Sequence, residues 1–320
     1  MRDCFREQAD ACESLGSPFT AHLLRLLADH LALGNPVADH ILHWPGDPSY
    51  RKDSVALRLV GGLHALTLNH ADPDLQALYA NPHHFSDAQM IATLLAAIAR
   101  HPEPLLHWLS SAPQTNEVRR SAALIAAGHW LTARFGLPLA LSELGASAGL
   151  NLNWDRYALA IGPGYGPADS PVRLTPEWRG SVPPVAPPQV VERRAVDLNP
   201  LDVTRDAVRI RSYIWADQAH RLALTQAAIA LATDIHVEQG DAVDWLEARL
   251  NDVMPGRLHL IYHTIAWQYF PKATQLRGEA LLQAAGKLAS VDAPLAHLAM
   301  EADGAEPGAA LTLRLGRGVR

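Results

Sequence analysis

Three acids and one histidine each close a short apolar segment in the second half of the chain. The acids are Glu143, Asp197 and Asp241, and the histidine is His263. Carboxylates accept hydrogen bonds from hydroxyl and amine groups, and an imidazole with a pKa near 6.5 can take up a proton at neutral pH. Brought together, these side chains would suit ligand binding and general base catalysis. For any single acid, the alternative is a helix N-cap or a turn residue.

A turn of small residues follows the first of these acids. Residues 145–149 read Gly-Ala-Ser-Ala-Gly, and a helix start is predicted directly after them. Such a turn lets backbone N–H groups and a helix N-terminus approach a ligand closely. Alternatively, the small residues only allow a helix to pack tightly against a sheet.

From residue 137 onward the sequence alternates between strand and helix patterns. Strands are predicted at 139–144, 190–196, 235–239, 258–263 and 295–300, and helices at about 206–232, at 243–250 and after the fourth strand. This alternation predicts an α/β fold with a doubly wound, mostly parallel sheet. Ligands of such sheets bind beyond the carboxyl ends of the strands, where the three acids and His263 would lie.

Gly and Pro interrupt this pattern between residues 157 and 188. The segment predicts a β-hairpin, which turns at residues 162–164 and returns at 172–174, followed by a Pro-rich loop. After the fifth strand one strand-like segment remains, at residues 310–315.

Residues 1–136 predict an all-helical N-terminal domain, and residues 137–320 the α/β domain. Apolar residues recur at helical spacing, Ser17-Pro18, Asp72-Pro73 and Ser86 mark helix starts, and Asn116 is predicted to cap the last helix of this part. Gly61 and Gly62 weaken the prediction of a helix over the stripe that begins at Val55.

Charge and composition exclude several classes of protein. The 320 residues carry 27 Lys and Arg against 33 Asp and Glu, a net charge of -6, which argues against a nucleic-acid binder or a polybasic membrane anchor. Cys4 and Cys12 are predicted to be reduced and structural. No apolar run reaches the ~18 residues of a membrane span, and no signal peptide pattern is found, so a cytoplasmic location is expected. The histidines show no metal-ligand spacing, and no metal site is predicted.

The acid-ended strands and the glycine turn resemble class I S-adenosylmethionine-dependent methyltransferases. Residues 143–149 look like their first motif, and 195–200 resemble the second-strand segment, whose acid holds ribose hydroxyls. Residues 239–242 resemble the third-strand segment, whose acid meets the adenine amine. The resemblance implies a Rossmann-like domain, S-adenosylmethionine as cofactor and a small-molecule methyl acceptor.

The resemblance also implies a set of site residues. The turn would line the amino-acid end of the cofactor, Asp197 would bind the ribose and Asp241 the adenine. The full cofactor set is Glu143, Gly145, Ala146, Ser147, Gly149, Asp197, Leu198, Asp241 and Ala242.

Candidate catalytic and substrate residues complete the predicted site. His263 is the candidate general base, with a core histidine as the alternative, and Asn116 and Glu117 are the other candidate catalytic residues, with an N-cap as theirs. Candidate substrate contacts are Gln114, Asn151, Trp267, Gln268 and Tyr269; for the aromatic ones ordinary core packing is the alternative.

Over its whole length the sequence resembles an uncharacterised bacterial family, domain-of-unknown-function family twenty-three thirty-two. The strings at residues 114–117, 145–152, 197–202 and 263–269 carry this resemblance. The family implies no established activity.

Other chemistries stay open. Residues 145–149 also fit G-x-S-x-G, the nucleophile elbow of α/β-hydrolases, with Ser147 as nucleophile and His263 or His297 as base. Against this, an elbow follows several earlier strands of its sheet, and residues 1–136 predict helices. A dehydrogenase fingerprint and a P-loop are absent from the sequence. A non-catalytic nucleoside-binding protein is the third possibility.

Overall fold

The computed structural model describes residues 1–232, 234–304 and 308–316, and the chain forms two compact units. The helical unit comprises Met1–Thr115 and Asp206–Ala223, and the sheet unit comprises Asn116–Arg205 and Leu224–Arg320. These bounds differ from the predicted boundary at residues 136 and 137 in two places. The helix α8 (Ser121–Phe135) belongs to the sheet unit, and the segment Asp206–Ala223, expected in the second domain, belongs to the helical unit.

Helices of the helical unit begin at the capping residues that the sequence predicts. Ser86 forms a capping box with Gln89 at the start of α6, and the Asp72 carboxylate accepts a hydrogen bond from the Leu75 amide at 3.0 Å. Ser17 precedes the proline that begins α2. The helices are α1 (Arg2–Ser14), α2 (Pro18–His30), α3 (Pro36–Leu42), α4 (Val55–Leu68), α5 (Pro73–Ala80), α6 (Asp87–Arg100) and α7 (Pro102–Leu109), with the 3-10 turn η1 (Pro82–His84).

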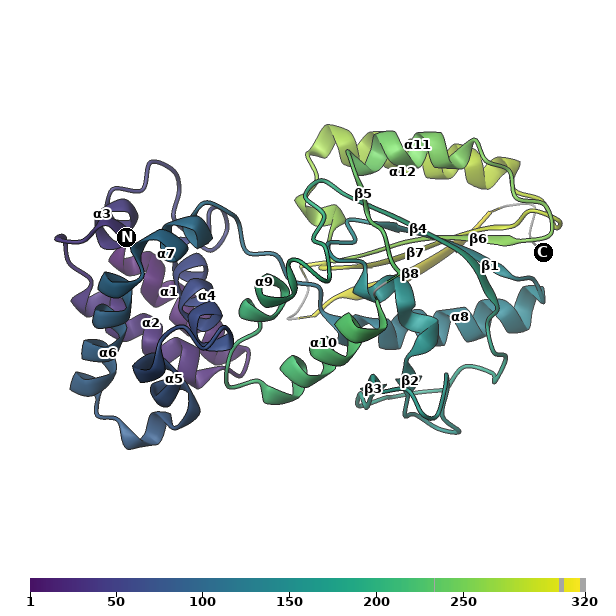
Figure 1. Ribbon diagram of the computed structural model, residues 1–320. Coiled ribbons are helices and arrows are strands. Elements are labelled where there is room, and N and C mark those ends of the chain that lie inside the picture. Colours follow the sequence, from purple (N-terminus) through teal and green to yellow (C-terminus); the bar gives the residue numbers. More distant parts are fainter. Residues whose placement is uncertain (233, 305–307, 317–320) are drawn as a thin grey trace. The chain divides into compact units, whose positions relative to one another are not determined.

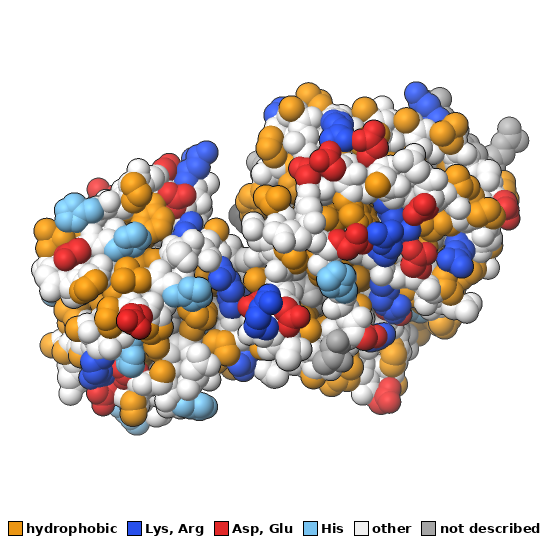
Figure 2. Space-filling view, turned by 45° about the horizontal axis from the view of Figure 1, so that its top comes forward, with side chains coloured by type: hydrophobic (Ala, Val, Ile, Leu, Met, Phe, Trp, Pro, Cys, Tyr) orange, Lys and Arg blue, Asp and Glu red, His pale blue; other side chains and the backbone are white. Residues whose placement is uncertain are grey.

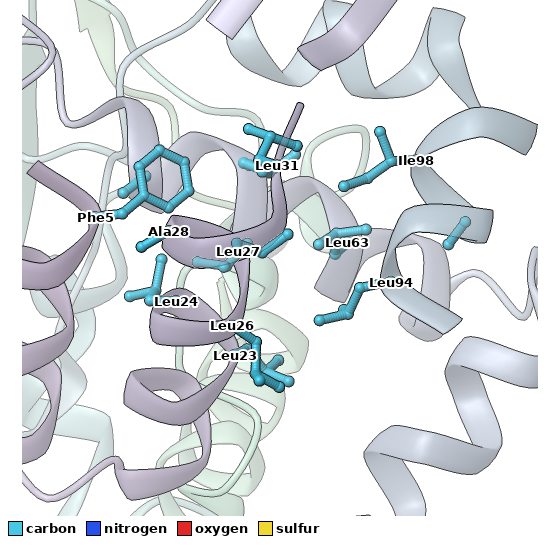
Figure 3. Packing of buried hydrophobic residues seen from close by; sticks show 14 of the residues in the cluster. Phe5, Leu23, Leu24, Leu26, Leu27, Ala28, Leu31, Leu63, Leu94 and Ile98 are labelled. Atoms are coloured by element: carbon cyan, nitrogen blue, oxygen red, sulfur yellow. The ribbon is translucent and has the colours of Figure 1, made fainter. Parts of the chain in front are cut away.

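Leucines at helical spacing form the core of this unit. Figure 3 shows Leu27 of α2, Leu63 of α4 and Leu94 of α6 in one cluster, and all three are fully buried. Burial of each such side chain contributes roughly 1.5–3 kcal/mol. The apolar stripes read from the sequence are therefore the faces that hold these helices together.

Gly61 and Gly62 lie inside α4, where a neighbouring segment packs closely. A Cβ at Gly61 would stand 2.5 Å from the Tyr213 ring, and His64 Nδ1 lies 3.1 Å from the Ser212 carbonyl oxygen. The single helix predicted over 206–232 is therefore wrong. The chain forms α9 (Ala207–Ser212) and then α10 (Ala219–Leu231), because α9 and Tyr213 pack against α4 of the helical unit.

The sheet unit contains the predicted mostly parallel sheet (Figure 1). Its strand order is β5-β4-β1-β6-β7-β8, and among these strands only β8 runs antiparallel, against β7. The third strand is shorter than predicted. The strands are β1 (Leu139–Leu144), β4 (Val190–Asp197), β5 (Glu238–Gln239), β6 (Leu258–Thr264), β7 (Leu295–Glu301) and β8 (Ala310–Leu315).

Helices cover both faces of this sheet. Figure 1 shows α11 (Ala242–Leu250) and α12 (Lys272–Leu288) together on one face and α8 on the other. The 3-10 segment η3 (Leu150–Arg156), which follows the glycine turn, contacts α8. This arrangement is a Rossmann-like α/β architecture.

The hairpin predicted in the insertion at 157–188 is wrong. The strands β2 (Ala158–Leu159) and β3 (Arg173–Leu174) pair in parallel, because the chain turns back after residues 162–164 only far enough to form one antiparallel bridge between Leu159 and Tyr165. It then loops round again before β3. Gly166 is required in this loop, since a Cβ there would meet the Tyr157 carbonyl oxygen at 2.0 Å.

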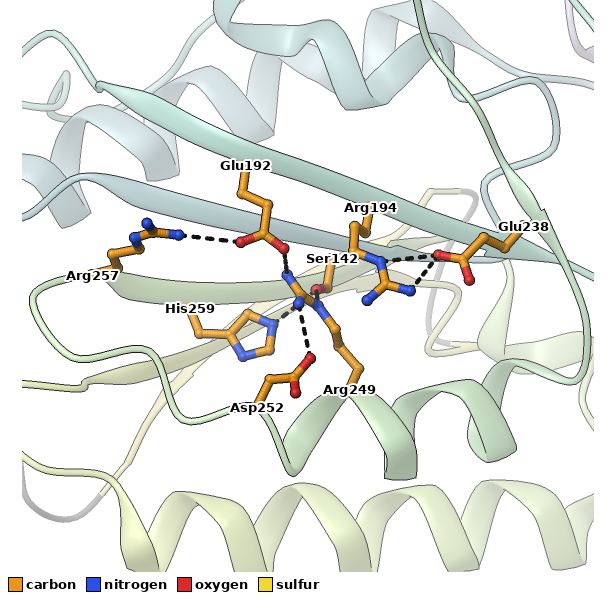
Figure 4. Close-up of polar contacts among 8 residues, drawn as sticks. All are labelled: Ser142, Glu192, Arg194, Glu238, Arg249, Asp252, Arg257 and His259. Carbon is orange, nitrogen blue, oxygen red and sulfur yellow. Dashed lines mark hydrogen bonds and ion pairs between the residues drawn. The ribbon is translucent and has the colours of Figure 1, made fainter.

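A buried polar cluster joins α11 to the sheet (Figure 4). The Arg249 guanidinium donates to Ser142 Oγ of β1 at 3.1 Å and to Glu192 of β4 at 2.5 Å. His259 Nε2 of β6 lies 2.8 Å from the same hydroxyl. Burial, and then the charge of Arg249, lower the pKa of His259 to about 3. The cluster is therefore held by one arginine charge shared among the Ser142 hydroxyl and the carboxylates of Glu192 and Asp252.

Surface charges of the sheet unit are paired rather than segregated on the face drawn in Figure 2. Arg156 lies 2.9 Å from Asp234, and Arg194 lies 2.7 Å from Glu238. None of the described helices is long and apolar enough to cross a membrane. Within the described part of the chain, no group of three or more His, Cys, Asp or Glu side chains could hold a metal ion.

Two glycines of α12 provide a matched test of how this helix packs. A Cβ at Gly278 would meet the Trp267 ring at 2.4 Å and Val243 at 3.0 Å, whereas one at Gly286 would make an ordinary contact of 3.6 Å with Gly316. We expect Gly278→Ala to lower the free energy of unfolding by about 1–3 kcal/mol through overpacking. Gly286→Ala should raise it by about 0.4–1 kcal/mol. Urea unfolding measures both, and equal effects of the two substitutions would contradict this packing.

Candidate functional site

The glycine turn after β1 has a strained backbone that brings two loops together. Gly145, Ser147 and Gly149 have φ angles of 68°, 56° and 70°, in the left-handed region that favours glycine. A Cβ at Gly145 would stand 2.5 Å from that of Ala266, in the loop after β6. Ile265 in that second loop also has a positive φ, 52°, which is a rare conformation for a β-branched residue. Strain of this kind clusters at functional sites.

Asp197 joins the ends of three neighbouring strands. Its Oδ2 accepts a hydrogen bond from the Ser147 amide at 2.8 Å, and its Oδ1 accepts one from Asn199 at 2.8 Å. The Asp197 carbonyl accepts from the Gly240 amide at 3.0 Å. The second acid therefore lies beside the glycine turn, and it holds the turn in place, a role that sequence reasoning missed.

The turn uses its amides inside the protein. Those of Gly145 and Ala146 donate to the Val196 carbonyl at 2.9 and 3.1 Å, and the amide of Gly149 donates to the Ala146 carbonyl at 2.8 Å. The Ser147 amide is bound to Asp197, so few backbone amides of the turn remain to bind an anion. Its surroundings favour a neutral or cationic group over a phosphate.

Asp241 and Leu198 lie at the outer part of the same edge. Asp241 is exposed and caps α11, its Oδ1 accepting from Val243 and Asp244 at 2.8 and 3.1 Å. The N-cap alternative therefore describes Asp241, although its second oxygen takes no part in these two bonds. Ala242 is the first residue of α11, so its amide has no intrahelical acceptor. The Leu198 side chain is 66% exposed and offers an apolar surface beside Asp197.

Glu143 lies buried beneath the turn, 2% exposed. The Tyr262 hydroxyl donates to its Oε2 at 3.4 Å. Burial raises the pKa of Glu143 to about 8, against the opposing effects of Tyr262 and Arg120. The side chain is therefore a neutral carboxylic acid near pH 7 and can donate a hydrogen bond.

Asn116 is not the helix cap that the sequence predicts. Its Oδ1 accepts a hydrogen bond from the Leu150 amide at 2.8 Å, and the residue before the 3-10 turn η2 (Val118–Arg120) is Glu117, which accepts from Arg119 at 3.1 Å. The correction has a simple cause: the first N–H after the glycine turn is buried and needs an acceptor. Asn116 thus belongs to the turn.

Asn151 lies beside the contact between Asn116 and Leu150. Gln114, the other polar substrate candidate of this part, belongs to the helical unit. The Asn151 side chain accepts from Ser121 Oγ at 2.7 Å and donates to the Glu117 carbonyl at 3.3 Å, and it is fully buried. These bonds make Asn151 a support of the site.

His263 is enclosed by three side chains. Its Nδ1 lies 2.7 Å from Glu301 Oε1, its Nε2 lies 3.0 Å from His297 Nε2, and its ring stacks on Trp267 at 4.8 Å. Burial, and then the neighbouring His263, lower the pKa of His297 to about 3. With both nitrogens engaged and 2% exposure, this arrangement favours the core-histidine alternative over the general base.

Glu301, at the end of β7, organises the loop after β6. It accepts hydrogen bonds from the amides of Ala266 and Trp267 at 3.0 and 3.1 Å in addition to His263. Burial would raise the pKa of Glu301, but the bonds from His263 and from these amides outweigh it and lower the pKa. No sequence motif marks this acid, which simply follows the fifth predicted strand.

The aromatic candidates in this loop differ in exposure. Trp267 packs on His263 and Gly278, as the core alternative predicts. Tyr269 is 74% exposed, and Gln268 is also exposed, its Oε1 accepting from the Ala302 amide at 3.3 Å. Of the two aromatic candidates, Tyr269 is thus the one whose side chain is exposed and could contact a ligand.

Arg120 is a further charged residue at this edge that sequence reasoning missed. Its guanidinium donates to the Thr264 carbonyl at 2.8 Å. Burial lowers the pKa of Arg120, and the nearby Glu117, Tyr269, Glu301 and Glu143 oppose that shift. A single arginine ahead of a helix gives no sequence motif, so only the folded chain reveals it.

The strand order reverses direction at this edge. From β1 the chain continues to β4 and β5 on one side and returns to β6 and β7 on the other. In doubly wound sheets the loops on either side of such a reversal bound the ligand crevice. Here they are the glycine turn and the loop that contains Ile265, Ala266 and Tyr269.

Comparison with known proteins finds one relation. A family model described as an uncharacterized protein conserved in bacteria matches residues 2–320. No curated protein and no solved structure matches the chain.

Glu143 makes stability depend on pH in a direction that can be measured. Its pKa rises from 4.5 to about 8 on folding, so its stabilising effect is fully present below pH 4.5 and is lost as the pH rises through 8. The buried histidines, whose pKa values are lowered, act below about pH 6.5. We expect wild type to lose stability relative to Glu143→Gln between about pH 5 and 8, by at most about 1.4 kcal/mol per pH unit, and to lose little more above pH 8.

Urea unfolding of both proteins across this range is the measurement. Glu247→Gln, in an exposed glutamate of α11, is the matched control and should leave the pH profile of stability unchanged. A constant difference between wild type and Glu143→Gln from pH 6.5 to 9 would show that Glu143 is ionised in the folded protein.

Proposed function

The chain belongs to this uncharacterized bacterial family, and we propose that it is an S-adenosylmethionine-dependent methyltransferase with a small-molecule acceptor. The observation that carries the proposal is the joining of Asp197 to the glycine turn. The 2.8 Å bond from the Ser147 amide to Asp197 puts a carboxylate and a tight backbone bend at one strand end, next to Asp241. Such a pairing suits a nucleoside whose ribose meets the acid.

The residues present fit the proposed cofactor by charge and hydrogen bonding. A carboxylate accepts about four hydrogen bonds, and Asp197 would accept one from a ribose hydroxyl beside those from the Ser147 and Asn199 amides. The second oxygen of Asp241 would accept from the adenine amine, and Leu198 would lie against the base. Arg120 would hold the ligand carboxylate. The turn, whose amides are used internally, would receive the cationic amino-acid end.

Bound S-adenosylmethionine supplies a methyl group on a positively charged sulfur, which is open to in-line attack. The protein's part is then to position the acceptor and exclude water. The neutral Glu143 would donate a hydrogen bond at the base of the turn, and Tyr269 would line the acceptor side. Because both ring nitrogens of His263 are engaged, His263 would not transfer a proton. A methyl acceptor that already has an available lone pair would therefore fit best.

The hydrolase alternative has weaker support. A serine nucleophile needs a base within hydrogen-bond reach, and Ser147 Oγ is buried with no hydrogen-bond partner among the described residues. The strand before it is also the first strand of its sheet. The left-handed φ of Ser147 fits an elbow equally well, so labelling by a fluorophosphonate decides between the two: we expect none at Ser147.

Calorimetry with S-adenosylmethionine and S-adenosylhomocysteine tests the proposal. Asp241→Ser keeps an N-cap for α11 but removes the carboxylate, so loss of a charge-assisted hydrogen bond should weaken binding about tenfold or more. Asp244→Asn, in the same helix and with the same loss of charge, is the matched control and should bind as wild type does. Asp197→Asn should abolish binding, because it disturbs both the turn and the ribose contact.

The outcomes separate the alternatives. No heat with either ligand from folded wild-type protein would refute the cofactor assignment. If the Asp241→Ser and wild-type proteins bound S-adenosylmethionine with equal affinity, the adenine would not bind at Asp241 and the start of α11. Binding of both ligands without transfer to any acceptor would indicate a nucleoside-binding protein.

A further inference from the structure

A cavity of about 220 Å³ lies in the sheet unit between α12 and the paired strands β7 and β8. The proposed cofactor site uses none of its lining side chains, since that site lies at the glycine turn and the start of α11. The cavity is therefore a separate candidate for ligand binding. Its walls include Leu282 and Lys287 of α12, Leu295 and His297 of β7, and Arg314 and Leu315 of β8.

Solvent reaches this cavity from its basic side. Lys287 is exposed, and the Arg314 side chain is 55% exposed. Leucines line the rest of the wall: Leu282 and Leu295 are 6% and 8% exposed, and Leu315 is half-buried. The side chains that would contact a ligand therefore keep accessible surface. The cavity combines charged groups near solvent with an apolar interior.

The charged residues at this cavity carry a net positive charge. Lys287 has no ion-pair partner among the described residues, and Arg314 pairs with Glu279. His297 adds no charge near pH 7, because burial, and then His263 and Arg314, lower its pKa to about 3. Two cations and one carboxylate leave a single positive charge. That balance suits a monoanion better than a phosphate dianion.

Two glycines bring α12 and the end of β8 together beside this cavity. Gly286 and Gly316 both line it, and a Cβ at Gly316 would stand only 2.8 Å from the Gly286 carbonyl oxygen. Backbone therefore forms part of the wall, and the Gly286 amide can report the binding of a ligand.

We propose that this cavity binds a small monocarboxylate with an apolar body, such as an aromatic acid. The carboxylate accepts hydrogen bonds from the Lys287 ammonium and from N–H groups of Arg314 other than the one that Glu279 accepts. The apolar body packs against the leucines, which removes apolar surface of both partners from water. The site is independent of S-adenosylmethionine, because it uses α12, β7 and β8 rather than the glycine turn.

The probe is benzoate, with benzyl alcohol as a matched ring without charge and acetate as a carboxylate without a ring. Titrated into the 15N-labelled full chain, benzoate should shift the backbone amide resonance of Gly286, which Gly286→Ala identifies by its loss. Benzyl alcohol and acetate should each bind roughly threefold or more weakly, because each lacks one of the two kinds of contact. This comparison uses the wild-type protein and does not depend on a variant that folds.

Two variants of α12 then test the charge contact. Lys287→Gln should weaken benzoate binding, measured by ligand-observed NMR, by about two- to fivefold, the usual value of one exposed ion pair. Lys272→Gln removes the same charge from an exposed position at the other end of the helix, outside the cavity. It is the matched control and should bind benzoate as wild type does.

No shift of the Gly286 resonance with benzoate would overturn the site. Equal binding of benzyl alcohol and benzoate, or binding of inorganic phosphate as tightly as benzoate, would overturn the carboxylate assignment. Equal binding of acetate and benzoate would overturn the apolar body. Because S-adenosylhomocysteine calorimetry on Lys287→Gln should match wild type, failure here is distinguishable from failure of the proposed methyltransferase function.

Discussion

One carboxylate fixes the geometry of the candidate cofactor site. Asp197 accepts the Ser147 amide through its side chain and the Gly240 amide through its carbonyl, so the ends of β1, β4 and β5 are joined at a single residue. A backbone turn with two positive-φ glycines and a positive-φ serine would otherwise have many conformations. The acid selects one of them, and this places the remaining candidates around it.

The glycine turn was predictable as a motif but not as a structure. Its strand–turn–helix context follows from residues 139–150, since apolar and small residues have clear local preferences. The residues that hold the turn lie far away in sequence. The Asn116 side chain accepts a hydrogen bond from the Leu150 amide, and the Asp197 side chain accepts one from the Ser147 amide. Only the folded chain reveals such partners, and for this reason the local pattern around Asn116 predicts a helix cap instead.

The same limit applies to the helices and to charge. Caps such as Ser86 and Asp72 act within four residues and were read correctly. The packing of α9 and Tyr213 against Gly61 joins segments about 150 residues apart, so the helix over 206–232 and the domain boundary were not readable. Arg120 and Glu301 are likewise ordinary residues locally, and they gain importance because burial brings them beside Glu143 and His263.

Buried titratable groups of the sheet unit form one cluster under α11 and occur again beneath the glycine turn, at the carboxyl end of β1. At the α11 cluster, Arg249 holds Ser142 and Glu192, and His259 is kept neutral by burial; all of these groups have protein partners. Glu143, the residue after Ser142 in β1, lies instead beneath the strained turn, where burial raises its pKa to about 8, and exposed Leu198, Asp241 and Tyr269 lie beyond the strand ends. Strain and unmatched polarity persist only where the surrounding structure compensates for them. The strand ends combine positive-φ backbone with exposed side chains, whereas the groups of the α11 cluster are paired with one another, and for this reason we propose the ligand site at the strand ends.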